Sequence, residues 1–209
     1  MKRIGVLLAA LLAAAATVAA CGSNTSSTSS TSTMSSAAAS SPAASHNAAD
    51  VMFTQTMIPH HEQAIVMAEL AAARAGSPTV KQLATRIRTA QAPEIAQMTG
   101  WLGQWGEPTI MPGTVSDSPS GGMMNGYHGS SSTPGMMSTS QMSQLRTLSG
   151  RAFDRAFLTE MTIHHRGAIR MAQIEARTGR HAAVRQLAKN IETSQTAEIA
   201  SMAAMLRQP

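Results

Sequence analysis

The sequence lacks much of what several protein classes require. It holds a single cysteine in 209 residues, which excludes both an internal disulfide framework and a zinc site built from several thiolates. Three Phe, two Trp and one Tyr are too few for a protein that binds nucleic acid by stacking bases on aromatic rings. The net charge of +5 reflects a shortage of acidic residues, of which there are 11, more than an excess of bases. No nucleic-acid partner is therefore expected.

Methionine, by contrast, is abundant, with 16 residues in the chain. Thioethers are ligands for soft metal ions, but methionine also fills irregular gaps in hydrophobic cores. The number alone suggests soft-metal chemistry, and the positions of the methionines relative to other ligand residues must decide between the two roles.

The N-terminal segment has the pattern of a bacterial lipoprotein signal. Two basic residues precede an apolar stretch over residues 4–20, which is short for a membrane span. The sequence Val18-Ala19-Ala20-Cys21-Gly22 follows, and it resembles the lipobox in which the cysteine becomes the lipidated first residue. We expect residues 1–20 to be removed and Cys21 to tether the mature chain to the extracytoplasmic face of the cell membrane. An ordinary secretory signal with an incidental cysteine is the alternative.

Residues 21–47 are rich in Ser, Thr and Ala and have almost no large apolar side chains, so they predict a flexible linker. Residues 48–209 are expected to form the domain. Within it an internal repeat dominates, because residues 50–102 align without gaps with residues 154–206 at an offset of 104, with 22 of 53 positions identical. Repeat 1 is assigned to residues 50–104 and repeat 2 to residues 141–209.

Each repeat predicts a helical hairpin. Apolar residues recur at helical spacing over residues 48–75 and again over residues 78–104. Between these segments Gly76-Ser77-Pro78 supplies a helix stop, an N-cap and a first-turn proline. Repeat 2 has the same pattern, with its turn near Gly179 and Arg180. Two hairpins with a long connection predict an all-α protein, a ferritin-like four-helix bundle.

Pro59 lies inside the first predicted helix, immediately before a histidine pair. It is expected to kink the helix there and to free the carbonyl of Gln55. Repeat 2 has Ile163 at the equivalent position, so the two halves are expected to differ in geometry or affinity.

Two histidine pairs fall on the faces that the bundle would bury. At 100° per residue, both members of each pair flank the apolar sector of their helix. Folding each hairpin about its turn brings a glutamate on the second helix level with the pair, and a carboxylate on such a face needs a partner or a metal. A methionine precedes each pair by one turn. The predicted metal ligands are His60, His61, His164, His165, Met57, Met161, Glu94 and Glu198, with each glutamate either a ligand or a partner that orients a histidine.

Thioether and imidazole ligands favour a soft ion, above all Cu(I). A copper protein for tolerance, storage or delivery is therefore the first interpretation. A di-iron or di-manganese redox enzyme is the alternative, although Met57 and Met161 stand where such bundles carry glutamate. A metal-free interaction module of the cell envelope is a third, with the histidines only fixing the packing. Nothing in the sequence indicates a hydrolase, so an enzyme is less expected than a binding protein, and a homo-oligomer stays open.

The connection over residues 105–140 is rich in Met, Gly, Pro and Ser and is expected to be irregular. Its exposed Met-Met pairs and one histidine would capture Cu(I) and pass it inward, or would belong to a low-complexity spacer. The residues of this secondary site are Met123, Met124, His128, Met136 and Met137. Asp50 and Asp154, which lie far from the histidines along the helix axis, are expected to have structural roles.

The string D-x-x-F-x-x-x-M-x-x-H-H-x-x-A-x-x-M-A occurs at residues 50–68 and again at residues 154–172. It resembles the hallmark of domain-of-unknown-function family 305. The resemblance implies a ferritin-like helical bundle that is often exported, and some members are described as binding copper or silver through Met and His. It implies no established activity.

Overall fold

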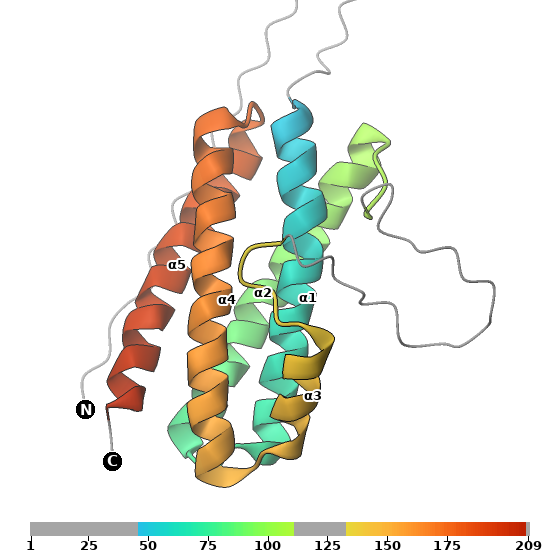
Figure 1. Cartoon of the computed structure of the whole chain (residues 1–209). Helices are drawn as coiled ribbons and strands as arrows, with labels where there is room; N and C mark the ends of the chain where they lie inside the picture. The colour runs from blue at the N-terminus through green and yellow to red at the C-terminus, as the bar shows by residue number, and fades with distance from the viewer. Residues whose placement is uncertain (1–45, 111–132, 208–209) are drawn as a thin grey trace, which may run out of the picture. The chain divides into compact units, whose positions relative to one another are not determined.

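We describe the protein in a computed structural model, which places residues 46–110 and 133–207. The predictions for the signal segment, for Cys21, for the linker up to residue 45 and for Met123, Met124 and His128 concern residues outside these ranges. Five helices follow one another along the chain (Figure 1): α1 (Ala48–Arg74), α2 (Pro78–Trp105), α3 (Thr139–Thr147), α4 (Gly150–Thr178) and α5 (Ala182–Leu206).

The four long helices form two antiparallel hairpins. Helix α1 packs along α2, and α4 packs along α5, while the main contact between the hairpins is made by α1 and α4. The predicted all-α four-helix bundle is thus confirmed. None of the helices in the described part of the chain is long and apolar enough to cross a membrane.

Local sequence explains where these helices begin. Asn47 accepts hydrogen bonds from the backbone of α1 in a capping box with Asp50. Pro78 occupies the first turn of α2, as predicted from the Gly-Ser-Pro turn. Helix α1 then continues through Pro59 to Arg74, so the proline does not end the helix. The kink expected at Pro59 stays a prediction.

Helix α3 is the element that the sequence analysis did not predict. The irregular connection was expected to reach residue 140, but a capping box of Ser138 and Gln141 starts α3 at Thr139. Met142 and Leu145 on α3 are buried in the core, together with Met137 just before it. The helix has only two buried apolar residues in nine, which explains why its periodicity was too weak to detect.

Methionine fills much of the core. Phe153 and Phe157 stack in one part of it, and few other aromatic rings are present. The flexible methionine side chain suits the irregular spaces that remain. The buried methionines are Met57, Met67, Met98, Met137, Met142, Met161, Met171 and Met202.

Each hairpin also clamps the turn of the other through a buried aspartate. Asp154 on α4 accepts hydrogen bonds from the backbone N–H groups of Gly76 and Ser77, at 3.1 and 2.9 Å. Asp50 on α1 accepts equivalent bonds from Arg180 and His181, the shortest at 2.9 Å. The two aspartates therefore have the structural role expected from the sequence.

Candidate metal centre

The two histidine pairs meet in the middle of the bundle. His60 and His61 come from α1, His164 and His165 come from α4, and all four are 0% exposed. The rings of His60 and His164 face each other across the contact between the hairpins, with centroids 3.7 Å apart and planes tilted by 39°. The sequence placed both pairs on buried faces, and the structure adds that equivalent histidines of the two repeats touch.

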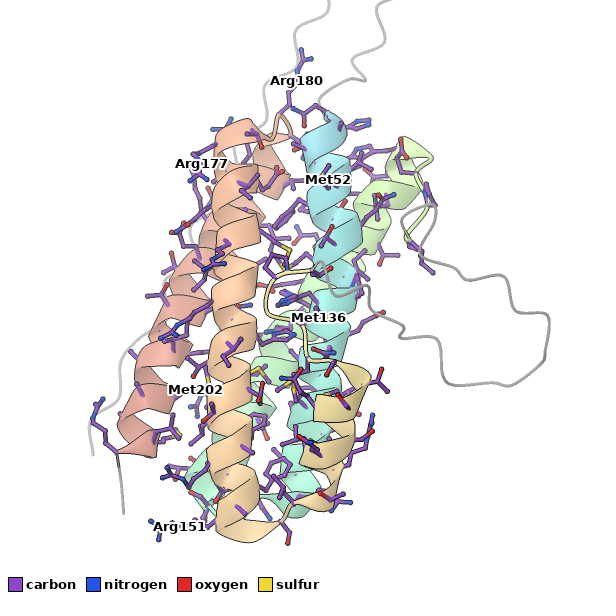
Figure 2. The ribbon with its side chains drawn as sticks, in the orientation of Figure 1. Met52, Met136, Arg151, Arg177, Arg180 and Met202 are labelled. Atoms are coloured by element: carbon purple, nitrogen blue, oxygen red, sulfur yellow. The ribbon has the colours of Figure 1, made fainter. Side chains whose placement is uncertain are left out.

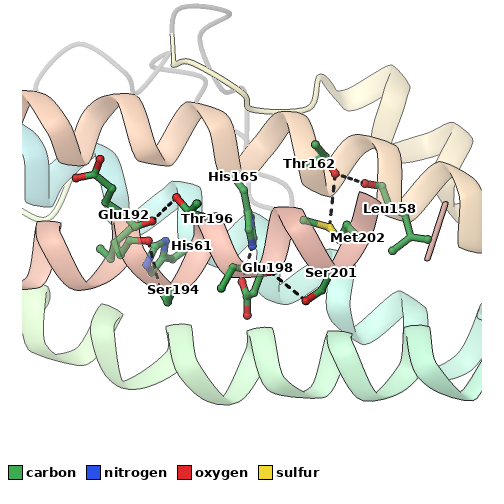
Figure 3. A network of polar contacts seen from close by, with 12 residues as sticks. His61, Leu158, Thr162, His165, Glu192, Ser194, Thr196, Glu198, Ser201 and Met202 are labelled. Atoms are coloured by element: carbon green, nitrogen blue, oxygen red, sulfur yellow. Dashed lines mark hydrogen bonds and ion pairs between the residues drawn. The ribbon is translucent and has the colours of Figure 1, made fainter. Parts of the chain in front are cut away.

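The other histidine of each pair is held by the glutamate that the sequence placed at its height. His61 Nε2 lies 2.7 Å from Glu94 Oε2. His165 Nε2 lies 2.6 Å from Glu198 Oε2, as Figure 3 shows. The glutamate side chains are 20% and 19% exposed, so they sit at the edge of the core. A carboxylate accepts the hydrogen bond, which puts the proton of a neutral imidazole on Nε2 and leaves the lone pair on Nδ1.

His60 is held in the same way, but by a backbone group. Its Nε2 donates to the carbonyl oxygen of Pro134 at 3.1 Å, so Nδ1 again carries the lone pair. The segment around Pro134 just precedes α3 and belongs to neither repeat pattern. Sequence analysis missed this residue, because a backbone carbonyl leaves no trace in a motif.

The remaining ring nitrogens are buried without partners. Among the described residues, Nδ1 of His60, His61 and His165 and both nitrogens of His164 have no hydrogen-bond partner. A buried polar atom left unpaired costs free energy. Histidines that bind metals commonly donate one ring N–H to a carboxylate or carbonyl and ligate through the other nitrogen. The donor atoms left free here therefore fit a metal ion.

The electrostatics of the central pair favour neutral rings. Burial, with His61 nearby, lowers the pKa of His60 to about 3. Burial also holds the pKa of His164 well below its usual range, and the neighbouring His60 lowers it further. Both rings are thus neutral at pH 7, the state in which imidazole ligates a metal.

The thioethers nearest in sequence are buried on the same helices. Met57 and Met161 precede His60 and His164 by one turn and are 0% exposed. Both also pack in the hydrophobic core, so a structural contribution accompanies any ligation.

Met137, predicted as part of an exposed pair for secondary capture, is 6% exposed. The expectation of exposure is wrong for this residue because its side chain packs in the core beside α3. Met136 next to it is half-buried.

The donor set is poor in hard ligands. In the described ranges, no group of three or more His, Cys, Asp or Glu side chains has an arrangement ready for a metal ion. The two glutamates contact the Nε2 side of His61 and His165 instead of sharing a centre. The site offers imidazole nitrogen, with a buried methionine one turn earlier on each of the two helices, which suits a soft ion of low coordination number better than a carboxylate-bridged metal pair.

The sequence matches one family model, Domain of unknown function (DUF305), over residues 50–206. No curated protein sequence matches the chain. Among solved structures, a DUF305 protein from Streptomyces coelicolor is 34% identical, with 76% of this chain and 91% of that chain covered and a TM-score of 0.63. A DUF305 fragment from Deinococcus radiodurans is 31% identical, with coverage of 77% and 97% and a TM-score of 0.64.

A third similar structure is CopM in its Cu(I)-bound form. It is 30% identical, covers 75% of this chain and 94% of its own, and has a TM-score of 0.59. The same protein is also matched in Cu(II)-bound and silver-bound forms.

Proposed function

The chain belongs to the DUF305 family, and from its buried histidines we propose that it binds copper, as Cu(I), for tolerance, storage or delivery outside the cytoplasm. The observation that carries the proposal is the set of buried imidazole nitrogens without partners where α1 meets α4. Support comes from CopM, a protein 30% identical to this one whose solved forms hold Cu(I), Cu(II) and silver.

In this proposal His60 and His164 supply the central donor atoms, because their rings lie closest together. His61 and His165 add one Nδ1 each, and Met57 and Met161 are the candidate thioether ligands. Glu94 and Glu198 orient histidines instead of binding the ion, since each already accepts a hydrogen bond from an imidazole.

The bundle contributes more than donor atoms. The rings of His60 and His164 are neutral before the ion arrives, so no proton has to leave either ring when copper binds. The surrounding apolar residues of α1 and α4 keep water away from the rings.

We propose further that Cys21 is lipidated and that the mature protein is tethered to the extracytoplasmic face of the cell membrane. The lipobox-like sequence at residues 18–22 supports this, and it lies outside the described residues. Mass spectrometry of the protein purified from membranes tests the anchor, because a diacylglycerol on an N-terminal Cys21 gives a defined mass increase. An unmodified chain that begins elsewhere would contradict it.

The test of copper binding uses residues 22–209, which contain every described helix. Bound metal is counted after purification, and Cu(I) affinity is measured by competition with a chromogenic chelator. We expect the His60→Ala/His164→Ala variant to lose affinity at least about 100-fold, since it lacks both central donors. His46→Ala is the matched control, because His46 stacks on Trp105 and takes no part in the site.

Two results would contradict the proposal. If changing all four paired histidines to Ala left Cu(I) affinity as in the parent, the site would lie elsewhere. Stoichiometric iron or manganese in the purified protein, with weak Cu(I) binding, would favour a redox enzyme instead.

A further inference from the structure

Residues 133–138, here called the strap, run between α1 and α4 beside the central histidine pair (Figure 1). The carbonyl of Pro134 binds His60 on α1, and Gly135 lies against the backbone of α4. Figure 2 shows Met136, the next residue, between the two helices. The strap thus touches both halves of the bundle at the height of the candidate metal centre.

On the α1 side, Gln63 binds the strap through two hydrogen bonds. The side-chain Nε2 of Gln63 donates to the carbonyl of Met137 at 2.9 Å, and its Oε1 accepts from the Met137 N–H at 2.8 Å. Both hydrogen bonds are buried, so neither competes with water. One side chain therefore satisfies both backbone groups of a strap residue.

On the α4 side, Gly167 leaves the space that the strap occupies. A Cβ atom on this residue would lie 1.9 Å from the oxygen and 2.4 Å from the carbon of the Pro134 carbonyl. Any side chain at Gly167 would therefore displace the strap. Gly135 complements this fit, since its φ of +83° and its approach to the His164 carbonyl both exclude a side chain.

Gln63 and Gly167 occupy the same position in the two repeats, because they are separated by the repeat offset of 104 residues. In the first repeat, Gln63 hydrogen-bonds to the strap, and in the second repeat, Gly167 leaves room for it. A glycine inside a helix costs about 1 kcal/mol relative to alanine, so Gly167 needs a local reason. The strap supplies that reason, because the Pro134 carbonyl occupies the space that a side chain at Gly167 would fill.

We infer that the strap is a positioning and access element of the histidine site. The Pro134 carbonyl fixes His60 with its proton on Nε2 and its lone pair on Nδ1, and the strap separates the His60–His164 pair from solvent. The inference rests on the proposed function where it concerns copper, and on geometry alone where it concerns the state of His60. Pro134 acts through its backbone, and it is Gly167 and Gln63 that hold it in place.

The decisive variant is Gly167→Ala in the protein of residues 22–209, without metal. Gly100→Ala is the matched control: Gly100 also lies within a helix, and a Cβ there meets nothing within 4 Å. Three properties are measured: amide exchange at Met137, the 15N shifts that report the His60 tautomer, and the rate at which diethyl pyrocarbonate modifies His60. In Gly167→Ala we expect faster amide exchange, a mixture of tautomers, and modification at least about ten-fold faster.

Gln63→Leu and Gln63→Glu test the strap without a steric clash. The leucine removes both hydrogen bonds to Met137 at similar volume, and we expect it to follow Gly167→Ala. The glutamate retains the acceptor for the Met137 N–H but sets a carboxylate oxygen against the Met137 carbonyl, so its effect should be at least as large as that of the leucine. These variants keep the inference testable if Gly167→Ala does not fold.

Faster exchange at Met137 with an unchanged His60 tautomer and unchanged modification would overturn the inference, because the strap would then move without affecting the site. Equal effects of Gly167→Ala and Gly100→Ala would overturn it as well. Cu(I) release to a chelator is measured in parallel, and we expect about ten-fold faster release from Gly167→Ala. If the parent binds no Cu(I), the proposed function fails, while the metal-free measurements still decide on the strap.

Discussion

His60 and His164 are equivalent residues of two repeats, yet their surroundings differ. The ring of His60 is held by the Pro134 carbonyl, whereas neither nitrogen of His164 has a partner in the described part of the chain. The contrast shows how a duplicated hairpin becomes asymmetric: the element that lies over the pair comes from the connection, of which there is one copy. A bound ion would therefore meet one ring whose Nε2 is held by a backbone carbonyl and one ring without such a bond.

The two turns differ in a similar way. Both are clamped by an aspartate, but the clamp on the second turn has a buried acid beside it. Glu175 is 1% exposed, and its equivalent in repeat 1 is Ala71. Burial and the neighbouring Asp50 raise the pKa of Glu175 to about 8, although Arg185 lowers it. Burial alone would raise the pKa of Asp50, but contact with Glu175 and hydrogen bonds from turn amides lower it.

The largest expected effect follows from this difference. The pKa of Glu175 is higher in the folded chain than in the unfolded chain, so protonation of its side chain stabilises the folded state. The contribution is complete below pH 4.5 and is lost as the pH rises through about 8. Because one pKa unit corresponds to about 1.4 kcal/mol, we expect the metal-free protein to lose about 4–5 kcal/mol of unfolding free energy between pH 4.5 and about pH 8. The Glu175→Gln variant should not lose this stability as the pH rises, because its side chain does not ionise.

Urea unfolding from pH 5 to pH 9 measures this, and the difference between parent and variant isolates Glu175, because the buried histidines act equally in both. Glu69→Gln on the exposed side of α1 is the control and should keep the pH dependence. A parent whose stability is flat above pH 5 relative to Glu175→Gln would contradict the assignment of a protonated acid at this turn.

The aspartates offer a direct comparison of the two turns. We expect Asp154→Ala to cost about 2 kcal/mol, because it leaves two backbone N–H groups of the first turn unpaired. Asp50→Ala removes the equivalent turn bonds and also the capping bond from the Asn47 N–H, but it relieves the acid pair with Glu175, so its cost should be smaller at pH 8 than at pH 5. Urea unfolding of both variants at the two pH values measures this, and a cost of Asp50→Ala that changes with pH no more than that of Asp154→Ala would show that the acid pair has no effect.

Much of this asymmetry was outside the reach of the sequence. Helical periodicity and the gap-free repeat predicted the hairpins, the turn at Ser77 and the position of Glu94 level with His61, because these features depend on local geometry. The contact between the rings of His60 and His164 depends on how the hairpins dock, and the strap holds His60 through a backbone carbonyl. The sequence does contain a sign of the asymmetry. In the second repeat, the residue equivalent to Gln63 is Gly167, and the residue equivalent to Ala71 is Glu175.

A second substitution pair tests whether the second turn can be converted into the first. A Cβ on Gly179 would overlap the carboxylate of Glu175, and repeat 1 has Ala75 and Ala71 at the equivalent positions. Gly179→Ala alone should cost about 1–2 kcal/mol of stability. In the Glu175→Ala background the same change should be nearly neutral, so the coupling energy should be about 1–2 kcal/mol. Additive effects would mean that the glycine serves another purpose.

The last comparison concerns the part of the site in which the repeats agree. Glu94 and Glu198 hold His61 and His165 at almost the same distance, 2.7 and 2.6 Å, and with almost the same exposure. If the proposed copper site is correct, Glu94→Gln and Glu198→Gln should each reduce Cu(I) affinity by about ten-fold, through the loss of a charged partner that orients the ring. The two losses should agree within about two-fold, because their geometry is the same in both hairpins. Chelator competition measures both, and a large difference between them would show that copper is bound by one hairpin, with the other supplying packing alone.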